Sequence, residues 1–116
     1  MAINYKNQGY DLATTALTTV LTISTSTVAI IKEISVANDD NSAHKVDYFF
    51  TDVSTSTSYK FYHTNVPADS HDNAVHNALV LEEGDFLQFQ ADTSNVISGQ
   101  ISYALLSRTG ENGLYT

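Results

Sequence analysis

The amino-acid sequence predicts an all-β protein, folded as a single antiparallel β-sandwich of jelly-roll or immunoglobulin-like type with extended N- and C-terminal arms. Three observations predict this class. Short segments rich in Thr, Val, Ile, Tyr and Phe alternate with turn-forming clusters, about every 8–14 residues. No window carries an apolar stripe of helical period over three turns. Charged residues make up only 16% of the chain, and the Ser and Thr that replace them suit a pleated surface.

Seven segments are expected to be strands: 14–24, 28–38, 45–52, 59–66, 78–81, 86–91 and 99–107. The first is also the nearest candidate for a helix, but its Thr content lowers helix propensity. In the second, strict alternation places Val28, Ile30, Ile34 and Val36 on one face. Segments 78–81 and 86–91 are expected to pair with each other as a hairpin. The longest irregular connection is expected at 67–77, which contains the single proline.

A chain of 116 residues suits one domain. We expect a core at 13–107 between an N-terminal arm (1–12) and a C-terminal arm (108–116), because both ends are polar and contain glycine. Apolar side chains in polar tails are natural anchors on a neighbouring molecule. The expected arm anchors are Ile3, Tyr5, Tyr10, Leu114 and Tyr115.

The charge balance excludes several partners. The formal net charge is −8, and the five Lys and Arg residues are scattered, whereas binding to nucleic acid or an anionic membrane needs clustered cations. The absence of cysteine excludes disulfides and thiolate chemistry. No apolar run approaches the roughly 18 residues of a spanning helix, and no secretion signal is visible. We therefore expect a protein made in the cytoplasm, with neither nucleic acid nor membrane as a partner.

Three acids, Glu82, Glu83 and Asp85, surround Gly84 at the expected hairpin tip. The simpler interpretation is a hydrated turn in which glycine supplies a positive φ and Asp85 bonds the nearby backbone. A calcium site is the alternative. It would need further oxygens from another loop, such as Asp69 or Asp92, because the spacing of an EF-hand is absent.

Histidines form a second candidate. His63, His71 and His76 lie within fourteen residues, and with neighbouring aspartates they could ligate a transition metal. No pair of histidines has the helical spacing of a metalloenzyme, so exposed loop residues are the simpler interpretation. His44 stands apart. We predict no metal and no cofactor, while the sequence leaves open whether this loop or the acidic tip binds an ion.

Catalytic patterns are missing. The sequence has no G-x-S-x-G nucleophile motif and no glycine-rich phosphate loop, and a sandwich of this size rarely forms the cleft that paired carboxylates need. We therefore expect no catalytic residue and no enzymatic activity.

Aromatic residues crowd two successive expected strands, 45–52 and 59–66. Alternation places Val46, Tyr48 and Phe50 on the core side. Phe49, Tyr59 and Tyr62 then form a possible exposed aromatic face. Such a face is typical of a protein contact or a sugar platform. The alternative is that both faces are covered.

The order of these segments resembles small β-sandwich virion proteins of tailed bacteriophages. Their pattern has an early "a-I-v-k-x-I-x-x-x-N" strand, a late "v-L-e-x-G-D-x-l-x-v-x-A" segment and a closing "i-S-Y". Here these match Ala29–Asn38, Val80–Ala91 and Ile101–Leu105, and the resemblance covers about residues 14–107. It implies a non-enzymatic structural subunit on the capsid, neck or tail, with no catalytic residues to transfer.

The leading hypothesis is therefore a capsid decoration, or cement, subunit that bridges neighbouring subunits through its termini. The implied partners are other virion proteins, either the major capsid protein or neck and tail proteins, and copies of the chain itself in a homo-oligomer. Its location would be the virion, after synthesis in the host bacterial cytoplasm. The alternatives are a neck or tail accessory ring protein and a carbohydrate-binding β-sandwich module.

Overall fold

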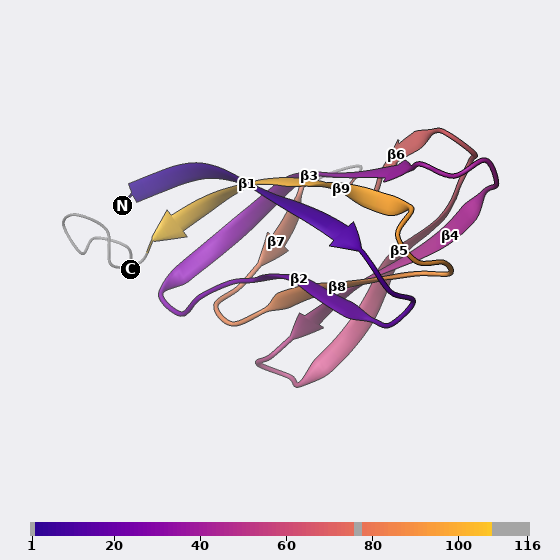
Figure 1. Ribbon diagram of the computed structural model, residues 1–116. Helices are drawn as coiled ribbons and strands as arrows, with labels where there is room; N and C mark the ends of the chain where they lie inside the picture. Colours follow the sequence, from indigo (N-terminus) through magenta and orange to yellow (C-terminus); the bar gives the residue numbers. More distant parts are fainter. Residues whose placement is uncertain (1, 76–77, 108–116) are drawn as a thin grey trace.

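The computed structural model describes residues 2–75 and 78–107, and all regular structure in that part of the chain is β-strand (Figure 1). This confirms the all-β class. Among the described residues, no helix is long and apolar enough to cross a membrane. The strands are β1 (Ala2–Leu12), β2 (Thr18–Thr22), β3 (Thr27–Asn38), β4 (His44–Asp52), β5 (Thr57–Val66), β6 (His71–Asn73), β7 (Leu79–Leu81), β8 (Phe86–Ala91) and β9 (Ile97–Ser107).

The strands form two antiparallel sheets that face each other. The first sheet has the order β1-β9-β3, with both β6 and β7 paired to the far side of β3, and the second has the order β2-β8-β4-β5. β6 and β7 pair with opposite ends of β3, so together they occupy the place of one interrupted strand. This order, in which the chain passes repeatedly from one sheet to the other, is that of a jelly roll. The immunoglobulin-like alternative does not apply.

The hydrophobic core lies between the sheets. Leu12, Ile31, Ile34 and Phe89 have almost no exposed surface, and Tyr48 lies at the centre. The Tyr48 ring meets Phe89 edge to face, with centroids 4.8 Å apart. Each fully buried side chain of this size contributes about 1.5–3 kcal/mol through removal of its surface from water. The aromatic and β-branched content of the sequence thus becomes a single core.

A β-bulge in β3 changes which side chains face this core. Ile31 is opposite Tyr103, but the next paired residue is Glu33, opposite Ser102. Lys32 is therefore an extra residue, and the alternation changes phase there. Ala29, Ile31, Ile34 and Val36 face inwards and are fully buried. The prediction that Val28 and Ile30 share a face with Ile34 is wrong, because strict alternation takes no account of a bulge.

Two further expectations are corrected by the strand pairing. Residues 78–81 and 86–91 are not a hairpin, because β7 pairs with β3 in the first sheet whereas β8 pairs with β2 and β4 in the second. The tip Glu82–Asp85 is instead a crossing between the sheets. The connection 67–77 is also less irregular than expected, since it contains β6.

The N-terminal segment is not an arm separate from the core. Residues 2–12 form β1, which pairs with β9 over its whole length without a register shift. Apolar Leu12 and Tyr10 at its end enter the core, which explains why a polar segment is held. The boundary expected at residue 12 is therefore wrong. The C-terminal arm, with Leu114 and Tyr115, lies outside the described residues.

Candidate assembly surface

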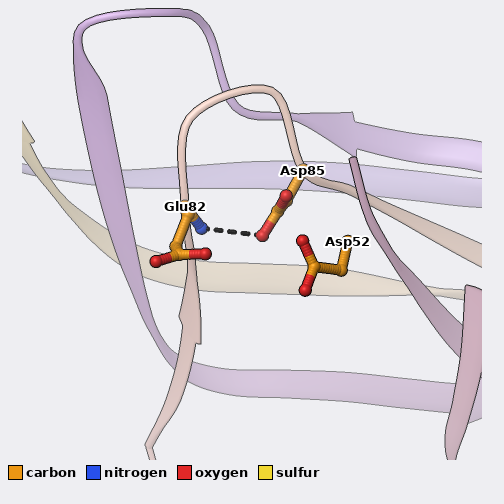
Figure 2. Close-up of side chains that lie close together, drawn as sticks. All are labelled: Asp52, Glu82 and Asp85. Atoms are coloured by element: carbon orange, nitrogen blue, oxygen red, sulfur yellow. Dashed lines mark hydrogen bonds between the residues drawn. The ribbon is translucent and has the colours of Figure 1, made fainter. Parts of the chain in front are cut away.

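The acidic crossing between β7 and β8 brings three carboxylates together (Figure 2). Asp52 at the end of β4, Glu82 and Asp85 each offer an oxygen within 4.8 Å of the others. Asp85 is only 4% exposed. One of its carboxylate oxygens accepts a hydrogen bond from the Glu82 amide at 2.9 Å, and the other accepts one from the Val53 amide at 3.2 Å. Asp85 therefore joins its own turn to the β4–β5 turn.

The same turn is also tied to the β2–β3 connection. The Ile23 amide donates to the Asp85 carbonyl, and the Gly84 amide donates to the Ile23 carbonyl. Gly84 has a φ of 84°, a conformation that glycine adopts without steric cost. A calcium ion would want six or more oxygen ligands, whereas both oxygens of Asp85 already accept backbone hydrogen bonds. The geometry thus gives this acidic turn a structural role in joining three connections.

The histidines lie in separate places. His63 is on β5 opposite Asp47, and His71 is on β6 in the other sheet. Among the described residues, neither belongs to a group of three possible metal ligands. His76 lies outside the described residues. The cluster suggested by their spacing in the sequence is therefore divided between sheets.

His44, at the start of β4, has a different environment. Its ring nitrogens lie 2.6 Å from an Asp40 oxygen and 2.9 Å from an Asp92 oxygen. The hydrogen bond to Asp40 is the main cause that raises the pKa of His44, and the same bond lowers the pKa of Asp40. The imidazole thus connects the β3–β4 and β8–β9 connections at one end of the sandwich.

The expected aromatic face does not exist as one platform. A bulge at Phe61 shifts the alternation of β5, so that Tyr62 pairs opposite Tyr48 on the inner face. Tyr59 pairs opposite Phe50 and stacks on its ring, with centroids 5.4 Å apart, but it remains 47% exposed. Tyr62 packs 5.6 Å from Tyr48, and its hydroxyl donates to Asp72. Phe49 lies on the opposite face of the sheet, with the ammonium of Lys60 5.5 Å from its ring centre. The three aromatics therefore cannot stack together on a sugar.

An apolar surface does exist elsewhere, on the outer face of the first sheet. Residues paired directly across antiparallel strands point to the same face. The row Asn4–Leu105–Ala29–Leu81 faces the core, since Ala29 and Leu81 are fully buried. The rows on either side of it must face outwards. These two rows form what we call the terminal apolar surface: Ile3, Leu106 and Val28 in one, and Tyr5, Ala104, Ile30 and Val80 in the other.

Three members of this surface are strongly exposed. The exposed fraction is 51% for Ile3, 83% for Tyr5 and 55% for Val80, and no member carries a charge. Two rows of apolar side chains across four strands form a continuous patch of the kind that marks a contact site. Neither Asn4 nor Lys6, which point to the other face of β1, is buried either. Figure 1 shows why: the first half of β1 and the end of β9 reach beyond the second sheet.

The two halves of β1 therefore differ. Tyr10 is buried, and its hydroxyl donates a hydrogen bond of 2.5 Å to the Ser35 carbonyl of β3. The prediction of Tyr10 as an anchor on a neighbour is wrong, because the side chain holds β1 to its own sheet. Ile3 and Tyr5 are exposed as an anchor must be, and their role stays a prediction.

Sequence reasoning missed five members of the terminal apolar surface. Strict alternation groups Val28 and Ile30 with Ile34, because the bulge at Lys32 has no signal in the sequence. Val80 was placed in a hairpin with β8, and pairing with β3 instead moves it beside Ile30. A possible signal is the two uncharged apolar runs at 28–31 and 79–81, seven residues together, which exceed what one buried face of each strand needs.

Comparisons with known proteins identify relatives by fold alone. The sequence matches no known protein family and no curated protein. Solved structures do match. A chain from the acid-stable capsid of the Helicobacter pylori bacteriophage KHP30 aligns with a TM-score of 0.56 and 9% identity, over 90% of this chain and 87% of that chain. The two chains are therefore similar in length.

Two other structures show that the fold is more widespread. A chain of the icosahedral T13 particle of infectious bursal disease virus aligns with a TM-score of 0.58 and 5% identity. It matches over 92% of this chain but only 32% of that chain. A Bacillus endospore appendage, from a family of disulfide-linked pili, aligns with a TM-score of 0.50 and 13% identity, over 89% of this chain and 85% of that chain. At these identities the likeness shows a common fold.

Proposed function

We propose that this chain is a non-enzymatic structural protein of a bacteriophage virion, and specifically a capsid decoration subunit. It contacts neighbouring virion subunits through the terminal apolar surface and the C-terminal arm. In this role the sandwich supplies a rigid body, and the chain works by burying surface against other proteins. It acts in the virion after synthesis in the bacterial host.

The observation that carries the proposal is the match to the phage KHP30 capsid chain. The alignment spans most of both chains, so the likeness concerns a small jelly roll that forms the whole subunit. In the viral particle of infectious bursal disease virus, by contrast, the matching part is about a third of a longer chain.

The terminal apolar surface supports the same proposal. A monomer gains nothing from exposing Tyr5 and Val80 in a continuous patch, whereas an assembly protein buries such a patch at its interface. A hollow of about 600 Å³ lies against Lys45, Asp47 and His63 on β4 and β5. The Asp47 carboxylate there lies 3.6 Å from the Lys60 ammonium, as in an ordinary surface ion pair.

The anchors follow from this proposal. Ile3 and Tyr5 contact a neighbouring subunit directly from β1. Leu114 and Tyr115 serve the same purpose from the C-terminal arm, whose nine residues extend up to about 30 Å when fully stretched. Aromatic side chains at the centre of an interface commonly carry most of its binding energy.

The test is to purify particles of the phage that encodes this chain and to locate the chain in them. Mass spectrometry and electron cryomicroscopy should find it on the capsid surface, in copy number comparable with the shell protein. A small cyclic set of copies at the neck or tail would replace decoration by the accessory-ring alternative. Complete absence from intact particles would refute a virion role.

A further inference from the structure

The four outer edges of the two sheets are protected to different degrees. Natural proteins shield sheet edges by keeping the edge strands short, bending them with bulges, or placing charges on them. β2 has five residues and a register shift between Thr19 and Leu21. β5 is longer, but it has the bulge at Phe61 and the charge of Lys60. The edge formed by β6 and β7 is divided into two pieces of three residues.

The β1 edge lacks most of these protections in its first half. The strand has eleven residues, no proline and no register shift against β9. Residues 3–9 are exposed on both faces of the strand, so no described element obstructs the approach of another strand. Lys6 is the single charged residue among the first ten. A long, regular and open edge of this kind pairs readily with another strand.

We infer that β1 pairs with β1 of a second copy of this chain, in an antiparallel and two-fold symmetric arrangement. The pairing joins the two first sheets into one continuous sheet across the dimer. This inference rests on the proposed function and deepens it by naming a second copy as the partner of the β1 edge. The rest of the terminal apolar surface stays available to other virion proteins.

Two observations favour a second copy as the occupant of this edge. The first is self-complementarity: a two-fold contact pairs each surface with itself, and β1 is the one long unprotected edge among the described strands. The second is charge. The whole chain carries a net charge of −8, whereas β1 has one Lys and one Asp, so β1 itself adds no net charge to a contact between two copies. The pairing also brings the exposed Ile3 and Tyr5 of both copies together on one face.

The experiment measures the mass of the full-length chain by light scattering during size-exclusion chromatography, over a dilution series. The wild type should have twice the mass of one chain. Tyr5→Lys should reduce it to the mass of one chain, because lysine at an edge opposes strand pairing. Tyr5 is 83% exposed, so the substitution should leave the fold intact, as circular dichroism would verify.

Two control variants separate this pairing from other contacts. Tyr59→Lys changes an exposed tyrosine on the protected β5 edge and should leave the dimer intact. Val80→Lys changes the terminal apolar surface on β7, three strands and about 14 Å from the β1 edge, and it should also remain dimeric. A monomeric wild type, or a Tyr5→Lys variant that stays dimeric, would overturn the inference. Loss of the dimer in Val80→Lys would do so as well, because it would indicate packing through the sheet face.

The outcome can be separated from that of the proposed function. Binding of each variant to phage particles lacking the chain reports on the virion role, whatever the mass in solution. If the wild type binds particles as a monomer, the dimer is wrong and the virion role stands. If it is a dimer that never binds particles, the pairing stands and the proposed function is wrong.

Discussion

The outermost strands β1 and β5 are similar in length but differ in how they meet solvent. β5 carries a bulge at Phe61 that turns Tyr62 inwards, and its Lys60 lies 3.6 Å from Asp47 and over the Phe49 ring. β1 runs straight against β9 and exposes Ile3 and Tyr5. One edge is closed by its own irregularity and charge. The other is held by the buried Tyr10 and leaves the residues before it exposed.

The largest effect on stability is expected where the second half of β1, near Tyr10, packs against β9 and β3. A Cβ atom on Gly99, which pairs with Tyr10, would lie 1.9 Å from the Ser35 carbonyl oxygen and 2.7 Å from the Tyr10 hydroxyl. Gly99→Ala should therefore lower the free energy of unfolding by about 3 kcal/mol or more, because backbone has to move. Urea denaturation measures the change.

Gly9→Ala is the matched control on the same pair of strands. Its Cβ would meet nothing closer than 4.0 Å, so the free energy of unfolding should stay the same or rise slightly. Equal destabilisation by both substitutions would show that the held half of β1 is not packed as described.

A smaller effect is expected at the acidic turn between β7 and β8, which is hydrogen-bonded to the β4–β5 turn. Asp85→Ala leaves the Glu82 and Val53 amides without their acceptor and should cost about 2 kcal/mol, since two hydrogen bonds to a buried carboxylate are lost. Glu82→Ala removes an exposed carboxylate of the same cluster and should change stability by less than about 0.5 kcal/mol. Thermal denaturation of both variants tests the structural role. If Glu82→Ala were as destabilising as Asp85→Ala, the carboxylates would act jointly, and the role given to Asp85 alone would be wrong.

Removal of a single hydroxyl tests how β1 is held. Tyr10→Phe keeps the ring in the core but loses the hydrogen bond to the Ser35 carbonyl. The expected loss is about 1 kcal/mol, while Tyr59→Phe should have no measurable effect. An unchanged denaturation midpoint for Tyr10→Phe would mean that apolar packing alone holds this half of the strand.

The smallest effect concerns pH at the end of the sandwich where β4 begins. The pKa of His44 is raised, mainly by Asp40, so its contribution is complete below its unfolded pKa of about 6.5 and is lost as pH rises through the folded pKa. The pKa of Asp40 is lowered, so its contribution is lost as pH falls through that lower value. His44→Gln should therefore flatten the slope of stability against pH above about 6.5. If the slope persists in the variant, the pH dependence of stability comes from another titrating group.

The sequence predicted the layers of this molecule better than its connections. Alternation in 45–52 identified the core face of β4 correctly, because Val46 and Tyr48 lie in a strand with no bulge of its own. It failed in β3 and β5, where Lys32 and Phe61 are extra residues that change the phase. A bulge depends on the partner strand, so it has no reliable signal within the strand itself.

The sequence also did not reveal which strands pair with each other. "ALVLEEGDFLQFQA" has the pattern of a hairpin, yet its halves belong to different sheets. Residues 2–12 are too polar to indicate a strand, and they are ordered because Tyr10 and Leu12 reach the core. The terminal apolar surface could not be predicted for the same reason, since its rows combine residues from four strands. Ile3 and Tyr5 were found because they are isolated apolar residues in a polar segment.

Amide hydrogen exchange along β1 tests the central claim most directly. In an unpaired edge strand, alternate amides point to solvent and exchange quickly, whereas a strand paired on both sides protects successive amides. Residues 3–8 of the wild type should be protected continuously, and Tyr5→Lys should restore rapid exchange at every second amide. Alternating rapid exchange in the concentrated wild-type protein and in phage particles that contain it would contradict the account.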